Sequence, residues 1–141
     1  MPELPKKVAI LRDARADGAV NLIAGLARMD GASPAFPRKE DSFDEKHSVD
    51  LHLIIQGAHY VCYVATCERV DADWRGSVPI EAVNESVTVL AVCPVGGLRY
   101  RIFRIRHDEF ATLKPKAGAF EIVIPADGSS FREIESFSEG L

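Results

Sequence analysis

Apolar and polar positions follow a helical spacing first along the chain and a strand-like alternation later. Between residues 6 and 29 the apolar side chains fall largely three and four residues apart, at Val8, Leu11, Ala19, Leu22, Ile23, Leu26 and Ala27. This spacing predicts a helix, which Asp17-Gly18 is expected to divide into two parts, with Asp17 capping the second part. The segment 30–47 is polar and contains two prolines, so a turn-rich surface loop is expected there.

Strand patterns dominate the rest of the chain. Residues 48–70 and 86–106 each predict a β-hairpin, with tight turns at Gly57-Ala58 and Gly96-Gly97. Residues 119–125 predict a fifth strand at the edge of the sheet.

The remaining segments connect and close this sheet. Residues 71–85 are expected to be irregular or partly helical, and residues 107–118 to form a short helical turn and a loop. Ser130 and Glu133 have the Ser-x-x-Glu spacing of a capping box, which predicts a final helix. The fold class that follows is α+β, an N-terminal helix packed on a mixed, mostly antiparallel sheet of about five strands.

The two faces of the first predicted hairpin differ in composition. Counting outward from the Gly57-Ala58 turn places His52 opposite Tyr63 and Asp50 opposite Ala65. The face expected to form the core carries Leu51, Leu53, Ile55, Tyr60, Cys62, Val64 and Thr66. The other face mixes polar and apolar groups, including Asp50 and His52, and is where chemistry is expected.

Composition narrows the class of protein. The 141 residues are 47% hydrophobic and 27% charged, which is typical of a globular chain, and residues 1–141 are expected to form a single domain. The apolar runs are shorter than the roughly 20 residues that span a bilayer, and charges interrupt the N-terminal run where a secretory signal would be apolar. A cytoplasmic protein with no membrane partner and free thiols at its three cysteines is therefore predicted.

Three features carry candidate chemistry. Asp50 and His52 could form a metal or acid-base pair, although Asp50 could equally cap a loop at the start of a strand. The net charge of −4 gives no global attraction to nucleic acid, so phosphate contacts require a local patch. A basic stripe of Arg99, Arg101, Arg104 and Arg106 could supply that patch, or could be a solvated face that blunts edge pairing. Trp74 is expected to cover the core or to anchor a partner.

Over roughly residues 15–125 the layout resembles that of small PD-(D/E)XK nuclease-fold proteins, which include group I intron endonucleases and restriction-endonuclease-like proteins. Gly18, Pro37, Asp50 and Asp108-Glu109-Phe110 fit the positions of that pattern. The resemblance implies a restriction-endonuclease-like fold and identifies Asp50 with the metal-binding aspartate of the family. The acid-spacer-lysine triplet of the family, however, falls on Tyr63-Val64-Ala65, where neither functional side chain is present.

These departures decide which function is expected. Mg²⁺ commonly needs more than one carboxylate, and a shifted register could recruit only Glu68 with Arg69. The favoured interpretation is a degraded, inactive nuclease site in a protein that binds nucleic acid or a protein partner, without a cofactor. One alternative is an active Mg²⁺-dependent nuclease that uses Asp50 with Glu68 or with an acid of residues 40–45. The other is an unrelated α+β ligand-binding or structural protein, so enzymatic activity stays an open question.

Overall fold

A computed structural model describes residues 3–37, 41–128 and 130–141. Its helices are α1 (Glu3–Met29), α2 (Ser42–Lys46) and α3 (Phe137–Gly140), with 3-10 turns η1 (Ile80–Ala82) and η2 (His107–Phe110). Its strands are β1 (Ser33–Ala35), β2 (Leu51–Ile55), β3 (Ala58–Thr66), β4 (Glu68–Val70), β5 (Asp73–Pro79), β6 (Thr88–Gly96), β7 (Arg99–Ile105), β8 (Ala119–Pro125) and β9 (Arg132–Glu133). The α+β class is confirmed.

The N-terminal helix is continuous. It runs through Asp17-Gly18, so the predicted division and the Asp17 cap are wrong. Because Ala19, Ile23 and Ala27 are buried along one side of α1, packing of that stripe offsets the small cost of a glycine inside the helix. The helix ends where the sequence indicates, since Gly31 follows with a φ of 93°. The side chains of residues 3–14, and so the first part of the predicted apolar stripe, lie outside the described residues.

The main sheet has six strands in the order β1-β2-β3-β6-β7-β9. All neighbours are antiparallel except β3 and β6, which are parallel, so the predicted mixed, mostly antiparallel sheet is confirmed. The two outer strands lie in segments predicted as loop and helix. The capping-box prediction is wrong because Glu133 pairs with Phe103 in the sheet, and Asp30 at the end of α1 accepts the Phe137 N–H at the start of α3 instead.

A second sheet, in the order β4-β5-β8, explains two further differences from the prediction. Residues 71–85 contain the strand β5, and residues 119–125 pair with β5 instead of forming an edge of the main sheet. The physical reason is the parallel pairing of β3 with β6, because parallel neighbours require a crossover connection. The chain makes this crossover through β4, β5 and η1.

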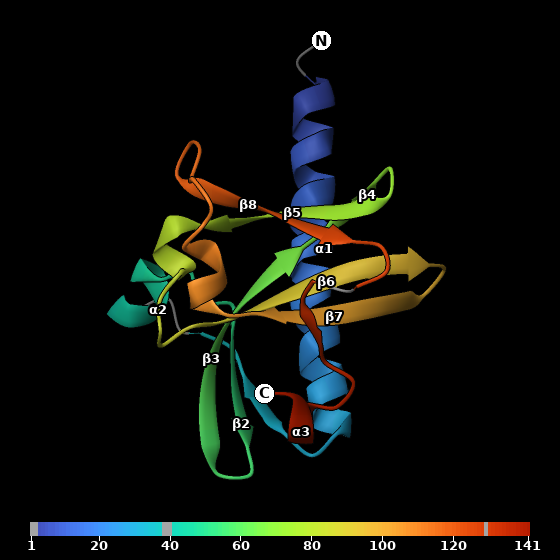
Figure 1. The fold of residues 1–141 in the computed structure, drawn as a ribbon. Coiled ribbons are helices and arrows are strands. Elements are labelled where there is room, and N and C mark those ends of the chain that lie inside the picture. Colours follow the sequence, from blue (N-terminus) through green and yellow to red (C-terminus); the bar gives the residue numbers. More distant parts are fainter. Residues whose placement is uncertain (1–2, 38–40, 129) are drawn as a thin grey trace.

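The central strands of the main sheet are buried on both faces, whereas the outer part of the β2–β3 hairpin is exposed on the face opposite α1. One face packs against α1 through Ile23, Leu53 and Leu90, among others. The opposite face packs against the small sheet, with Val89 and Phe103 contacting a cluster that contains Ile122 and Trp74. Figure 1 shows α1 passing behind the strands of the main sheet, with β5 and β8 crossing above β6 and β7. No helix in the described part of the chain is long and apolar enough to span a membrane.

Trp74 fills the second core. It is 2% exposed, and its indole N–H donates to the backbone carbonyl of Pro94 at 2.8 Å. The expectation that it covers the core is therefore confirmed, although it lies in a strand and not in an irregular connection.

The cysteines are free and buried, as expected. Cys62 belongs to the α1 side of the sheet and Cys67 to the opposite side. Burial raises the pKa of the Cys62 thiol to about 12, and a hydrogen bond with Cys67 together with burial raises the pKa of Cys93. Neither Cys62 nor Cys93 is therefore a thiolate nucleophile at neutral pH.

Close packing between the layers gives a test of this arrangement. Gly76 lies against Cys67, and a Cβ added at position 76 would lie 2.7 Å from the Cys67 sulfur. We expect Gly76→Ala to lower the free energy of unfolding by about 1–3 kcal/mol, as overpacking does in close-packed cores. Urea denaturation of the full chain measures this change. In a Cys67→Ala background, which removes the sulfur, we expect less than half of the loss to remain.

Gly25 supplies the matched control. An added Cβ there has no neighbour within 4 Å, so Gly25→Ala in α1 should stabilise the protein by about 0.5–1 kcal/mol through helix propensity. An equal loss at Gly76 with and without the Cys67 sulfur would contradict the packing described above.

Candidate functional site

The first hairpin is formed with a register two residues away from the predicted one. Ile55 pairs with Ala58, so the turn residues are Gln56 and Gly57, both with positive φ, at 51° and 82°. This is the conformation that two-residue hairpin turns require, and the alanine of the predicted turn is less suited to it. Because the shift is an even number, each side chain stays on its predicted face. Leu51 pairs with Cys62, which places Asp50 beside Tyr63.

Asp50 is held by backbone contacts just before β2. Its carboxylate Oδ2 accepts the Val64 N–H at 2.8 Å, and its own N–H donates to the Cys62 carbonyl at 2.9 Å. Burial raises the pKa of Asp50 above its ordinary value of 3.8, and the charge of Asp17 raises it further, against the lowering effect of the Val64 hydrogen bond. Burial and the nearby Asp50 also raise the pKa of Tyr63 to about 12. The environment of Asp50 therefore disfavours negative charge.

The acids expected to assist Asp50 lie elsewhere or outside the described residues. Glu68 is at the start of β4, where its side chain is 67% exposed and pairs with Arg15 at 3.0 Å. Of the acids in residues 40–45, residue 40 is not described, Asp41 caps α2 and Asp44 contacts His52. Among the residues that are described, no three His, Cys, Asp or Glu side chains are arranged to hold a metal ion.

His52 does not pair with Asp50. Its Nε2 lies 2.8 Å from Oδ2 of Asp44, and its Nδ1 lies 2.8 Å from Nε2 of His59. Asp44 is one of the acids of residues 40–45 that are candidate partners of Asp50 in the sequence. Its contact with His52 could not be predicted, because Asp44 lies in a polar segment and is buried only when α2 folds against the hairpin. The partner of His52 is thus set by tertiary packing.

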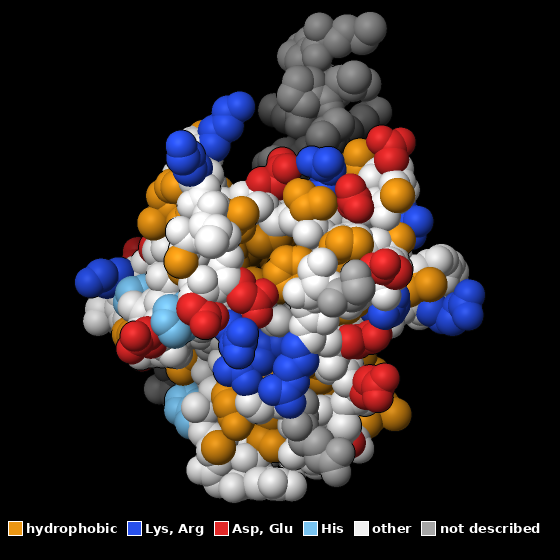
Figure 2. All heavy atoms as spheres, in the orientation of Figure 1, with side chains coloured by type: hydrophobic (Ala, Val, Ile, Leu, Met, Phe, Trp, Pro, Cys, Tyr) orange, Lys and Arg blue, Asp and Glu red, His pale blue; other side chains and the backbone are white. Residues whose placement is uncertain are grey.

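The four arginines of the basic stripe do not share one surface. Arg101 makes two hydrogen bonds to the carboxylate of Glu133, at 2.9 and 2.7 Å, and Arg104 donates to the backbone carbonyl of Leu141. Positions 101 and 104 differ by an odd number, so these side chains leave opposite faces of β7. Arg106 is exposed beside Asp108 and Glu109. Figure 2 shows the Lys and Arg side chains in the middle of one face bordered on both sides by Asp and Glu.

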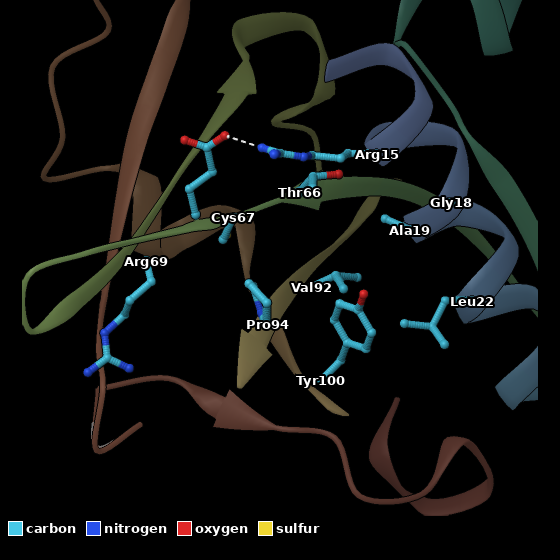
Figure 3. A pocket seen from close by; sticks show the side chains of 11 residues that line it. Arg15, Gly18, Ala19, Leu22, Thr66, Cys67, Arg69, Val92, Pro94 and Tyr100 are labelled. Atoms are coloured by element: carbon cyan, nitrogen blue, oxygen red, sulfur yellow. Dashed lines mark hydrogen bonds and ion pairs between the residues drawn. The ribbon is translucent and has the colours of Figure 1, made fainter. Parts of the chain in front are cut away.

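Two neighbouring clefts lie between α1 and the strands. The first is a cavity of about 690 Å³, in which Ala19 and Leu22 of α1 face Val92 and Tyr100 (Figure 3). The second has a volume of about 720 Å³ and is lined by Tyr63 together with residues of β5, β8 and the loop before β8. Arg15, Thr66 and Glu68 line both clefts. The Arg15–Glu68 ion pair, dashed in Figure 3, therefore lies between them.

Basic side chains around the second cleft were not found from the sequence. Arg15, Arg75 and Lys116 come from α1, β5 and the loop before β8, and only the fold brings them to one cleft. Arg75 pairs with Glu121 at 2.9 Å, and both side chains are more than two-fifths exposed. Lys116 has no ion-pair partner among the described residues. No linear spacing links these three positions.

The raised pKa of Asp50 predicts how stability depends on pH. The proton on Asp50 favours the folded state, a contribution that is complete below the ordinary value of 3.8 and is lost as pH rises through the raised folded pKa. Asp50→Asn is neutral at every pH and can still accept the Val64 N–H, so we expect a melting temperature a few degrees higher at pH 7 and equal at pH 3. Scanning calorimetry across this range measures the difference.

Asp50→Ala is the comparison variant. It removes the acceptor of the Val64 N–H, so it should destabilise the protein at every pH by about 1–3 kcal/mol. An Asp50→Asn variant that is less stable than the wild type at pH 7 would contradict the assignment of a disfavoured charge.

Comparison with known proteins shows a similar fold in a solved structure but no match by sequence. No protein-family model and no curated protein matches the sequence. Among solved structures, a bacterial homing endonuclease is similar over 87% of this chain and 81% of its own, with a TM-score of 0.59 and 18% sequence identity. The chain therefore has a nuclease-like α+β fold, in which one long helix packs on a mixed sheet of six strands.

Proposed function

We propose that this protein is a single-domain member of the PD-(D/E)XK, restriction-endonuclease-like group that binds nucleic acid but no longer cuts it. The main support for this proposal is the set of residues around Asp50, where the family pattern requires ionisable side chains. In the pattern that the sequence resembles, the family's acid and lysine fall on Tyr63 and Ala65, which lie on β3. Burial raises the pKa of Asp50 and that of Tyr63, so this environment disfavours negative charge on both side chains.

The chemistry of phosphodiester cleavage supports the inactive assignment. A metal ion in such a site orients water and offsets the charge that develops on phosphate, and Mg²⁺ requires hard oxygen ligands in a nearly octahedral set. If Mg²⁺ bound here, Asp50 would be its first ligand. Asp50 instead uses one oxygen for the Val64 N–H, and burial raises its pKa. Neither Tyr63 nor Ala65 offers a second carboxylate.

The second cleft supports binding. Arg15 and Arg75 are paired with Glu68 and Glu121 in exposed ion pairs, which contribute little stability and exchange partners easily. A phosphate group could replace either glutamate, because guanidinium binds phosphate through paired donors. Lys116 adds a third cation to the same cleft. Arg101 and Arg104 are committed to contacts within the protein, so we propose this cleft as the binding surface in place of the basic stripe that includes Arg99 and Arg106.

Two variants with the same charge change separate the cleft from the basic stripe. Lys116→Glu alters the cleft, and Arg99→Glu alters the exposed end of β7. We expect Lys116→Glu to weaken binding of labelled duplex DNA or RNA by at least about tenfold at low salt, and Arg99→Glu to have a much smaller effect. Fluorescence anisotropy at several salt concentrations measures both. Equal losses would place binding on the stripe, and no binding by the wild type would favour an unrelated α+β protein.

Cleavage is tested on the same preparations. Supercoiled plasmid incubated with the wild type and Mg²⁺ or Mn²⁺ should remain uncut. Nicking by the wild type that is abolished in Asp50→Ala would contradict the inactive assignment and establish a metal-dependent nuclease. Nicking that persists in Asp50→Ala would indicate a contaminant.

A further inference from the structure

A line of three hydrogen-bonding side chains crosses the first hairpin on the face opposite α1. Asp44 on α2, His52 on β2 and His59 on β3 are joined by two contacts of 2.8 Å. We propose that His52 and His59 bind a divalent transition-metal ion of the Zn²⁺ or Cu²⁺ class, with Asp44 as the residue that positions His52. This site does not involve Asp50 and does not depend on the proposed nucleic-acid function.

The two imidazoles have the geometry of a chelating pair. His52 pairs with Val61 and His59 with Ile54, so the histidines are diagonal neighbours on one face of the hairpin. Their ring centroids are 5.0 Å apart, and the nearest nitrogens are 2.8 Å apart. Two imidazole nitrogens bound to one metal at about 2.0–2.1 Å lie about 2.9–3.3 Å apart. Replacing the shared proton by a metal therefore requires the nitrogens to separate by a few tenths of an ångström and both rings to turn so that their lone pairs meet at a point beside the line that joins the two nitrogens.

The contact with Asp44 determines which ring nitrogen of His52 is available to a metal. Its carboxylate side chain is 6% exposed, and its Oδ2 lies 2.8 Å from Nε2 of His52. A carboxylate accepts from the protonated Nε2 of His52, so in the neutral form of the ring Nδ1 presents its lone pair toward His59. A carboxylate behind a ligating histidine is the usual support of such ligands. Asp41 holds Asp44 in place by accepting its N–H at the start of α2.

The ligand type selects the metal. Imidazole suits Zn²⁺, Cu²⁺ and Ni²⁺, whereas Mg²⁺ and Ca²⁺ prefer oxygen. Only two protein ligands are present, and no group of three is arranged for a metal within the described ranges. The remaining coordination positions are thus open to water or to an exchangeable ligand. An open site on an exposed hairpin is suited to reversible binding instead of structural support.

Calorimetric titration of the full chain with ZnCl₂ at pH 7.5 tests the site. We expect one Zn²⁺ per chain, at least about a tenfold loss of affinity in His52→Gln and in His59→Gln, and no heat with MgCl₂. His107→Gln is the matched control, because His107 is half-exposed and lies near Glu85 on another part of the surface. No Zn²⁺ binding by the wild type, full affinity in His59→Gln, or an equal loss in His107→Gln would overturn the proposal.

The role of Asp44 needs its own measurement. Asp44→Asn keeps an oxygen acceptor for His52 but removes the charge, so we expect Zn²⁺ affinity to fall by about tenfold. The Cu²⁺ electron paramagnetic resonance spectrum should still show two nitrogen ligands in this variant and one in His59→Gln. A Cu²⁺ spectrum of the wild type without two equivalent nitrogens would contradict the chelating pair, whatever the affinities. Unchanged Zn²⁺ affinity in folded Asp44→Asn would overturn the positioning role.

Discussion

Strand β3 pairs with a neighbour on each side, and these two pairings determine how the other strands are arranged. This strand lies antiparallel to β2 and parallel to β6, so it fixes both the hairpin that carries Asp50 and the direction of the chain that follows. The parallel pair requires a crossover, and this crossover forms the small sheet that covers the second face of the main sheet. The clefts beside α1 arise where this added layer meets the helix.

The same strand determines the chemistry beside Asp50. Val64 uses its N–H to hold the carboxylate, its side chain points to the α1 core, and Tyr63 and Ala65 flank it on the other face. A nuclease-like fold is thereby combined with a carboxylic acid whose charge is disfavoured. The arginines that line the second cleft, Arg15 and Arg75, form exposed ion pairs with Glu68 and Glu121.

Much of the fold was predictable because it is local. The periodicity of β2 and β3 identified the core face correctly even with a register error of two residues, since an even shift leaves every side chain on its face. The short strands β1 and β9 were missed because their pairing depends on distant partners and not on their own sequence. The position of β8 was missed for a related reason, because it depends on a crossover that no local pattern encodes.

The candidate site was less predictable than the fold. Asp50 could be selected from its place before an apolar strand, but its partner is a backbone N–H, which no residue type reveals. His52 was selected for a partner two residues away and instead contacts Asp44 and His59. The arginines of β7 looked alike in the sequence, yet Arg101 is held by Glu133 and Arg104 by a backbone carbonyl. Alternation along one strand cannot show which of its side chains meets a buried partner.

Asp50 is a mostly buried acid, and we propose that it does not bind Mg²⁺. The most direct measurement is a carbon-13 NMR titration of the Asp50 carboxyl group from pH 2.5 to 8, with and without Mg²⁺. We expect a midpoint above the ordinary value of 3.8 that Mg²⁺ does not move. A midpoint below that value, or one that Mg²⁺ lowers, would show an ionised ligand and would contradict it.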